Sequence, residues 1–221
     1  MFQTELLLRE FVTHDVQRYI LAKPEGFSFT PGQAIELAID EPQWREEARP
    51  FTLTNRVDDR VLELMIKSYG DHDGGMTQTL GKAQPGQKLL LSEAFDSFTY
   101  DGPGWFIAGG AGITPFLAII RDLADRGELE GQKLIYSNKT AADIIQQREL
   151  EAAFGENAHF VCTREHSPLC THSGHVDDAF LREHVRDLSE EFYVCGPPAF
   201  TEQVKKTLGD LGGNTQSMEF G

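Results

Sequence analysis

Short segments with alternating or continuous apolar residues run through the first hundred positions of the chain. They are Leu6–Phe11, Val16–Ala22, Ala34–Ile39, Val61–Lys67 and Lys88–Leu91. Turn-forming pairs such as Pro31-Gly32 and Pro85-Gly86 separate them. Many short strands at this spacing are typical of a small barrel or sandwich.

The pattern changes after a glycine- and proline-rich stretch at residues 99–104, a plausible linker. Apolar strands then alternate with helical segments, which predicts a parallel sheet wrapped by helices. The expected strands are 105–108, 133–136, 159–163 and 192–195, and the expected helices are 115–126, 141–154, 177–187 and 199–211. We therefore expect two domains, at residues 1–100 and 101–221.

Composition narrows the possible functions. The 221 residues are 40% hydrophobic and 25% charged, as in an ordinary globular protein. Because no apolar run approaches the roughly 20 residues needed to cross a bilayer, and the first residues lack a signal-peptide core, a soluble, cytoplasmic protein is expected. We also expect it to be a monomer. A net charge of −15 argues against nucleic acid or an anionic membrane as the main partner.

The cysteines and histidines argue against a disulfide framework, an iron–sulfur cluster and a metal site. Three cysteines predict no disulfide framework and cannot supply the four thiolates of a plant-type iron–sulfur cluster. The spacings of His159, His166, His172, His175 and Cys170 match no zinc-binding pattern, so these histidines are expected at the surface and no metal site is expected.

The strongest local signal is the glycine turn in Ala108-Gly109-Gly110-Ala111-Gly112-Ile113-Thr114-Pro115. Glycines allow a tight turn and a close approach to a ligand, and Thr114 is a suitable N-cap for a helix that begins at Pro115. The start of that helix would favour phosphate or the nicotinamide ribose. Because Pro115 replaces the third glycine of the dinucleotide fingerprint, plain strand-to-helix packing is an equally good interpretation of this segment alone.

A second glycine-containing turn, Cys195-Gly196-Pro197-Pro198, follows another predicted strand. Ligands of open parallel sheets lie beyond the carboxyl ends of the strands, so the two turns could face one another across a crevice. Burial as a small apolar side chain is the alternative for Cys195.

In the first half, Arg49-Pro50-Phe51-Thr52-Leu53-Thr54 combines a guanidinium, a ring and hydroxyls. Alternation on a strand would place Arg49, Phe51 and Leu53 on one side, which suits a flat cofactor that carries phosphate. Taken alone, however, the segment favours the alternative interpretation, a half-buried strand that has an arginine at its edge. Further on, Gly75-Met76-Thr77 opens a short predicted helix whose N–H groups would suit a diphosphate.

These motifs occur in the order R-P-F-T-L-T, G-G-M-T, G-G-A-G-I-T-P and C-G-P-P, and over essentially its full length the chain resembles the ferredoxin–NADP reductase superfamily. The resemblance implies an antiparallel β-barrel flavin domain followed by an α/β parallel-sheet nicotinamide-nucleotide domain. It implies FAD rather than FMN, and NADH or NADPH as hydride donor.

The resemblance also implies roles for individual residues. Arg49 would bind the flavin phosphate, Phe51 would stack on the flavin ring, and Thr52 would hydrogen-bond its reactive edge. The other cofactor-binding residues implied are Pro50, Leu53, Thr54, Ile66, Lys67, Tyr69, Gly75, Met76 and Thr77 on the flavin side, and Gly110, Gly112, Thr114, Cys195, Gly196 and Pro197 on the nicotinamide side. Cys195 would act by packing beside the nicotinamide and not as a nucleophile.

Two further parts of the chain bear on the same chemistry. The resemblance implies that Ser137, Asn138 and Lys139 lie at the nucleotide, where Ser137 and Lys139 could meet a 2′-phosphate. Asn138 stands where phosphate-binding relatives often carry arginine, which favours NADH over NADPH. A solvated loop charge is the alternative for Lys139. At the C-terminus, Phe220 could cover the flavin and Glu219 could assist catalysis, with a frayed terminus as the alternative.

The function expected is transfer of hydride from NAD(P)H to FAD and of electrons to a separate acceptor, such as ferredoxin or flavodoxin. The alternatives are a reductase component for an oxygenase, cytochrome or ferric chelate, and a non-catalytic regulator that binds flavin or nucleotide.

Overall fold

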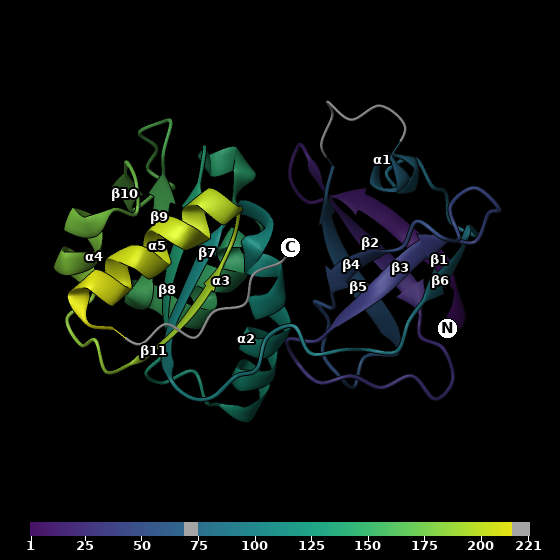
Figure 1. Cartoon of the computed structure of the whole chain (residues 1–221), viewed down its shortest axis with the longest axis horizontal. Coiled ribbons are helices and arrows are strands. Elements are labelled where there is room, and N and C mark those ends of the chain that lie inside the picture. The colour runs from purple at the N-terminus through teal and green to yellow at the C-terminus, as the bar shows by residue number, and fades with distance from the viewer. Residues whose placement is uncertain (69–74, 214–221) are drawn as a thin grey trace. The chain divides into compact units, whose positions relative to one another are not determined.

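The computed structural model describes residues 1–68 and 75–213. These residues form two compact units (Figure 1). The first contains residues 1–99 together with 114–122, and the second contains residues 100–113 and 123–213 of the described chain. Each unit is described by itself.

The first unit is built on a six-stranded antiparallel sheet with the order β4-β3-β6-β1-β2-β5. The strands are β1 (Phe2–Phe11), β2 (Val16–Ala22), β3 (Ala34–Ile39), β4 (Arg49–Thr52), β5 (Val61–Lys67) and β6 (Lys88–Leu91). The two end strands approach one another, because the backbone N–H of Thr54, just after β4, donates to the carbonyl of Glu63 in β5 at 2.9 Å. The sheet is therefore a nearly closed barrel, as predicted.

Apolar side chains from the strands fill the barrel. Tyr19, Leu37, Leu64 and Leu91, from four different strands, are fully buried within it. The short helix α1 (Met76–Leu80) contributes Met76 and Leu80 to the same core. Burial of these side chains is the main stabilising contribution to the unit.

The second unit is a five-stranded parallel sheet with the order β10-β9-β8-β7-β11. The strands are β7 (Gly104–Gly109), β8 (Lys133–Asn138), β9 (Ala158–Cys162), β10 (His172–Ser173) and β11 (Glu191–Cys195). The helices that begin outside the barrel unit are α3 (Gln147–Phe154), α4 (Asp178–His184) and α5 (Pro198–Leu211), and α2 (Thr114–Arg126) is shared between the two units. The parallel-sheet prediction is confirmed.

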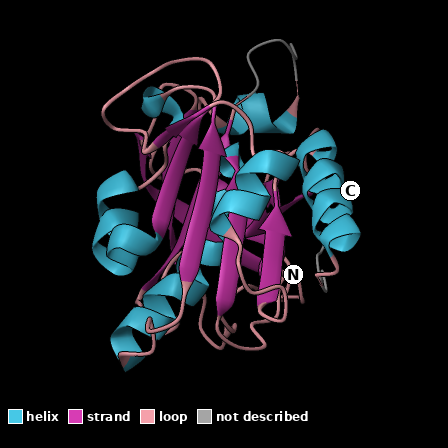
Figure 2. Ribbon diagram, turned by 90° about the vertical axis from the view of Figure 1, so that its left-hand side faces the viewer, coloured by secondary structure: helices cyan, strands magenta, loops and turns pink. Residues whose placement is uncertain are grey.

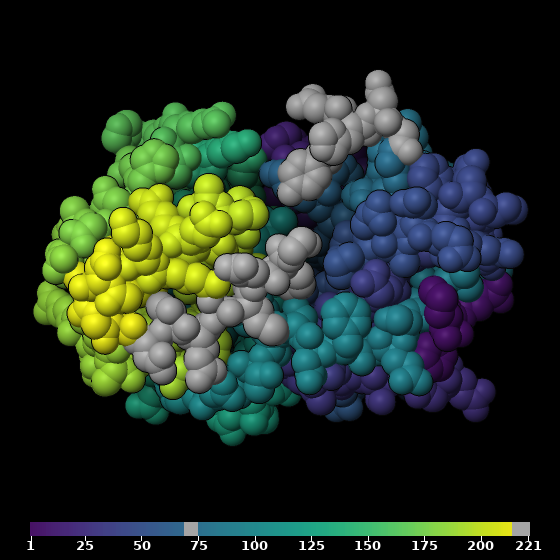
Figure 3. Space-filling view, in the orientation of Figure 1, coloured from purple at the N-terminus to yellow at the C-terminus, as the bar shows by residue number. Residues whose placement is uncertain are grey.

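Helices cover both faces of this sheet. Leu181 of α4 and Val204 and Leu208 of α5 pack on one face against Ile107 and Val194. On the other face Phe154 of α3 meets Phe106 of β7 edge to face, with ring centroids 6.2 Å apart. Figure 2 shows helices on either side of the strands, and the outer side of α5, yellow in Figure 3, forms part of the molecular surface.

The helix predicted over residues 141–154 is wrong in its first half. Residues Ala141–Asp143 form a single 3₁₀ turn, and α3 begins only at Gln147. Thr140 and Asp143 form a capping box, with the Thr140 N–H donating to the Asp143 carboxylate at 2.8 Å. The N–H of Ile145 then donates to the Tyr136 hydroxyl at 3.3 Å instead of to a helical carbonyl. These contacts end the 3₁₀ turn, and the α-helix begins separately at Gln147.

Candidate functional site

The first candidate site is the strand β4 of the barrel unit. Arg49 is exposed and forms an ion pair with Glu47 at 2.9 Å, while Phe51 is half-buried and packs against the barrel core. Thr52 is only 5% exposed. An exposed guanidinium beside a partly exposed ring is an arrangement that can hold a phosphate-bearing aromatic ligand.

The last two residues of the motif do not continue this strand. β4 ends at Thr52, and both Leu53 and Thr54 are fully buried. Leu53 belongs to the barrel core, so it does not share an exposed side with Arg49 and Phe51. The Thr54 hydroxyl donates to the Glu63 carboxylate at 2.8 Å. Within the barrel unit, these two side chains hold the strand in place.

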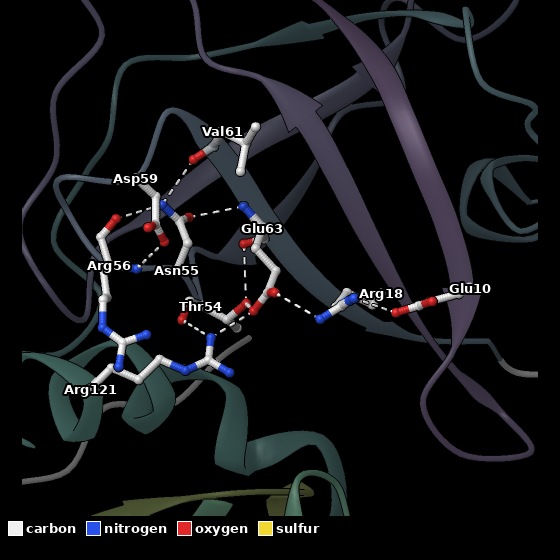
Figure 4. Close-up of polar contacts among 9 residues, drawn as sticks. All are labelled: Glu10, Arg18, Thr54, Asn55, Arg56, Asp59, Val61, Glu63 and Arg121. Atoms are coloured by element: carbon white, nitrogen blue, oxygen red, sulfur yellow. Dashed lines mark hydrogen bonds and ion pairs between the residues drawn. The ribbon is translucent and has the colours of Figure 1, made fainter.

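A buried polar network extends from Thr54 (Figure 4). Arg121 of α2, in the part of that helix that belongs to the barrel unit, donates to the Glu63 carboxylate at 2.6 Å and to the Thr54 carbonyl at 2.5 Å. Arg18 lies 3.6 Å from the other carboxylate oxygen of Glu63. The Asn55 side chain accepts from the Glu63 N–H at 2.9 Å. The network fixes the segment that directly follows β4.

The second flavin-side strand predicted from the sequence is β5. The side chain of Ile66 is 2% exposed and lies in the barrel core, so it offers a ligand its backbone only. Lys67 forms an ion pair with Asp15 at 2.7 Å. Burial alone would raise the pKa of Asp15, but the hydrogen bond and charge of Lys67 outweigh it and lower that pKa.

The predicted diphosphate turn is described only in part. Gly75 precedes α1 in an extended conformation, and a Cβ placed on it would meet no atom within 4 Å. The Met76 side chain is buried in the barrel core, and Thr77 is half-buried. The open backbone at Gly75 is accessible to a ligand. Tyr69 lies outside the described residues.

In the second unit the glycine turn lies at the carboxyl end of β7. Gly110 has a φ of +53°, which favours glycine, and residues Gly110–Ile113 form one 3₁₀ turn that runs into α2. The N-cap of α2 is Ile113, and Thr114 is the first helical residue. The prediction that Thr114 caps the helix is therefore wrong by one position, because the 3₁₀ turn already prepares the helix start.

The turn after β11 lies directly against this glycine turn. β7 and β11 are neighbours with Ala108 opposite Cys195, and a Cβ on Gly112 would lie 2.3 Å from the Cys195 carbonyl oxygen. A Cβ on Gly196 would lie 2.8 Å from the ring of Phe200. The two turns, predicted to face one another across a crevice, are thus in direct contact at this point, and only glycine at position 112 allows this approach.

Cys195 itself is a buried thiol, 3% exposed. Burial raises its pKa to about 12, against a smaller opposing effect of the Gly196 backbone. The thiol is therefore neutral at physiological pH and unsuited to nucleophilic attack. The turn continues with Gly196, which is half-buried, and Pro197, which is exposed and precedes α5.

Sequence reasoning missed Tyr136, a fully buried residue of β8. Its hydroxyl donates to the Gly110 carbonyl at 3.0 Å and accepts from the Ile145 N–H at 3.3 Å. Burial raises the pKa of Tyr136 well above its usual value, so the hydroxyl stays protonated. Tyr136 thus holds the glycine turn in place, and an aromatic residue on a predicted strand gave no hint of this contact.

The residues after Tyr136 differ in exposure. Ser137 and Asn138 are buried at the end of β8, whereas Lys139 is exposed. Of the C-terminal candidates, Glu219 and Phe220 both lie outside the described residues. One disulfide joins Cys162 to Cys170, a single local link where the cysteine count predicted no disulfide framework.

Family models match both halves of the chain. The "Oxidoreductase FAD-binding domain" model matches residues 3–100, and the "Oxidoreductase NAD-binding domain" model matches residues 106–206. The chain belongs to the ferredoxin reductase-like superfamily. The barrel unit of this superfamily member accordingly carries the FAD-binding domain, and the sheet unit carries the NAD-binding domain.

Individual relatives agree with this assignment. The superfamily member is 32% identical to a protein named propane 2-monooxygenase, reductase component, from Mycolicibacterium goodii, covering 96% of the present chain and 64% of the relative. It is 27% identical to NADH-cytochrome b5 reductase 2 of Mycosarcoma maydis, covering 94% and 65% of the two chains. The chain thus spans about two thirds of the length of these relatives.

Among solved structures, a ferredoxin NADP⁺ reductase from Neisseria gonorrhoeae with bound FAD and NADP has the same fold. The TM-score is 0.83 at 21% identity, and the match covers 98% of each chain. Within the described part of this superfamily member, no helix combines the length and apolar character required for a membrane span.

Proposed function

We propose that the chain is an FAD-dependent reductase that takes hydride from NADH and passes electrons to a separate acceptor protein. The observation that carries the proposal is the presence of an FAD-binding and an NAD-binding oxidoreductase domain in one chain. These are the binding sites for the two cofactors of a hydride relay, and hydride transfer is the reaction the pair supports.

The residues of the barrel unit fit FAD. Arg49 is exposed and forms its ion pair with the equally exposed Glu47, and it also donates to the neighbouring Ala48 carbonyl, so a phosphate can take the place of Glu47. The Phe51 ring is partly accessible for stacking, and the backbone at Gly75 is open to a diphosphate. Bound FAD supplies the hydride-accepting ring and the capacity to release the two electrons one at a time.

We assign the chain's own residues as follows. Arg49 binds phosphate, Phe51 stacks on the ring, and the Thr52 hydroxyl orients the ring's reactive edge, with Pro50 fixing the strand between them. Gly75, Met76 and Thr77 bind the diphosphate through their backbone. Leu53, Thr54 and Ile66 act by supporting this segment from the core, and Lys67, held by Asp15, lies at the end of β5.

Gly110, Gly112 and Gly196 of the NAD-binding unit let the backbone approach the nicotinamide half of the nucleotide. Thr114 is the first residue of α2, and Pro197 is the N-cap of α5. The neutral thiol of Cys195 packs beside the nicotinamide and excludes water. Hydride transfer needs the reacting atoms about 3–3.5 Å apart, so positioning is the main contribution of these residues. Glu219 and Phe220 are proposed to act at the ring face.

NADH is proposed as the donor because Ser137 and Asn138 are buried and uncharged where a 2′-phosphate would need a cation. Lys139 is exposed, and the backbone N–H of Arg164 donates to the Lys139 carbonyl at 2.9 Å, so the two residues are neighbours. Their positive side chains are the ones that could bind the 2′-phosphate of NADPH. Stopped-flow reduction with each nucleotide decides between them. Preference for NADPH that disappears in Lys139→Ala or Arg164→Ala would contradict the assignment.

The acceptor is proposed to be the protein component of an oxygenase or a b-type cytochrome, since the relatives carry the names of reductases for such partners. With a net charge of −15, the chain is expected to lose rate at low ionic strength with an acidic acceptor and to gain rate with a basic one. Measuring the rate of acceptor reduction across a range of ionic strengths tests the direction of this effect.

The proposal is tested first on the purified protein. A yellow sample whose colour bleaches anaerobically on addition of NADH is the expected result. A yellow sample that neither NADH nor NADPH bleaches would support the alternative, a flavin- and nucleotide-binding regulator.

A further inference from the structure

Three histidines from three different elements converge at the β10 edge of the parallel sheet. His159 comes from β9, His172 from β10 and His184 from the last turn of α4. One ring nitrogen of each lies within 4.8 Å of the others, and Nδ1 of His159 is 3.1 Å from Nε2 of His172. In a tetrahedral zinc site with Zn–N distances of about 2.0–2.1 Å, ligand nitrogens lie roughly 3.3 Å apart. Small ring rotations therefore suffice to bring the three imidazoles around one ion.

One of the three rings is already held in the orientation that a ligand requires. Nδ1 of His184 is 2.9 Å from the Phe180 carbonyl oxygen, which can only accept, so this nitrogen carries the proton. Nε2 is then the nitrogen with a lone pair available to a metal. Metal-binding histidines characteristically donate their other N–H to a backbone carbonyl or carboxylate in this way.

The surroundings of the cluster hold the rings without burying them completely. Phe180 stacks on His184 with centroids 4.2 Å apart, and Trp105 stacks on His159 at 5.9 Å. All three histidines are half-buried, not sealed.

We propose that His159, His172 and His184 form a binding site for a divalent transition-metal ion, with Zn²⁺ as the preferred ion. Neutral imidazole suits zinc and its neighbours in the first transition row, whereas calcium and magnesium require oxygen ligands. Three protein ligands leave a fourth position for water or an external ligand. Spacing along the chain could not reveal the site, because its ligands are 13 and 12 residues apart and come from three separate elements.

The site is separate from the nucleotide-binding residues of the same unit. His159 is the second residue of β9, near its amino end, whereas Gly110, Asn138 and Cys195 lie at the carboxyl ends of their strands. Strand alternation also places His159 and Cys162 on opposite faces of β9. The neighbouring group of Cys162, Glu165 and Cys170 is therefore a different candidate, and its two thiols are joined in a disulfide.

The experiment uses the full, tag-free, FAD-loaded chain titrated with Zn²⁺ and with Co²⁺. We expect one ion per chain by native mass spectrometry. Each of His159→Ala, His172→Ala and His184→Ala should weaken Zn²⁺ binding by at least about 100-fold, more than the roughly 10–100-fold typical of losing a supporting residue. The exposed His166 and His175 provide the matched controls, His166→Ala and His175→Ala, which should bind as the wild type does.

Long-range ¹H–¹⁵N spectra of the wild-type imidazoles give a readout that needs no variant. Zn²⁺ should shift the ring nitrogens of His159, His172 and His184 and leave those of His166 and His175 in place. The proposal is overturned if the wild type binds no Zn²⁺ or if the shifts fall on other histidines. It is also overturned if Cys170→Ala abolishes binding while His184→Ala does not, which would assign the ion to the thiol group instead.

Discussion

At the scale of single residues, the location of Cys195 determines the chemistry of its thiol. Its carbonyl lies against Gly112 and its side chain is 3% exposed, so it contributes a small apolar surface at the meeting point of two turns. The sequence allowed either a buried or a functional cysteine, and the structure shows a buried thiol at the end of β11.

Because burial raises the pKa of the Cys195 thiol to about 12, the thiol stays protonated at pH 8. We expect iodoacetamide to leave Cys195 unmodified at pH 8 in the folded protein and to label it rapidly after denaturation, as mass spectrometry would show. Rapid labelling of the folded protein at pH 8 would contradict a neutral, buried thiol.

The ion pair between Arg49 and Glu47 gives a second residue-scale prediction. Because charge-assisted hydrogen bonds contribute about 1.5–3 kcal/mol, Arg49→Ala should weaken FAD binding by about 10–100-fold, while Glu47→Gln should strengthen it by removing a competitor for the guanidinium. FAD affinity by fluorescence quenching measures both changes. Arg45→Ala, which removes another exposed arginine from the same loop, is the control and should leave affinity unchanged.

Tyr136 leads to a third prediction. Tyr136→Phe keeps the ring in the core but removes the hydrogen bonds to Gly110 and Ile145. The glycine turn should loosen, which raises the KM for NADH about tenfold, while the protein still folds and binds FAD as before. An unchanged KM in steady-state assays would show that the hydroxyl does not position this turn.

At the scale of elements, the buried network around Glu63 should determine the stability of the barrel unit. Side chains of Arg121 and Glu63 are 9% and 10% exposed, so Arg121→Ala leaves a buried carboxylate partly unpaired. Breaking a buried pair in this way costs about 3–5 kcal/mol, towards the lower end here because Arg18 remains nearby.

Urea unfolding of the FAD-loaded protein measures that loss. The control is Lys88→Ala, which removes the exposed ion pair with Glu5 in the same unit and should change stability by no more than about 0.5 kcal/mol. Equal effects of the two substitutions would contradict the structural role of the network.

Elements with a clear local pattern were predictable from the sequence. β2, β3, β5 and β6 have the predicted bounds, since apolar runs between turn residues largely determine where such strands begin and end. In the second half of the chain, the observed elements differ from the predicted ones where contacts between separate segments compete with local preference. The Ile145 N–H, bonded to Tyr136, is one such case, and the two-residue strand β10 has too little pattern of its own to be recognised.

The residues of the candidate site likewise fall into those that the sequence pattern indicates and those that only the structure reveals. Arg49, Gly110, Gly112 and Cys195 could be proposed as site residues because glycine turns and a charged residue at a strand start are visible in the sequence. Tyr136, Arg121 and the three clustered histidines could not, because their contacts join residues distant along the chain. The burial of Leu53 and Thr54 was also hidden, since the end of β4 depends on the contact with Glu63.

At the scale of the whole molecule, two family domains in one chain indicate a relay between two cofactors. The chain spans slightly less than two thirds of the length of these relatives. Placement of hydride donor and flavin is the task that the proposed residues share.

The measurement that tests this account most directly is rapid anaerobic mixing of the FAD-loaded protein with NADH, and with NADH deuterated at the transferred position. We predict that flavin absorbance is lost at a rate that saturates with NADH and is several-fold slower with the deuterated donor, as expected when the hydride moves in the observed step. Flavin that stays oxidised under saturating NADH and NADPH would contradict the account.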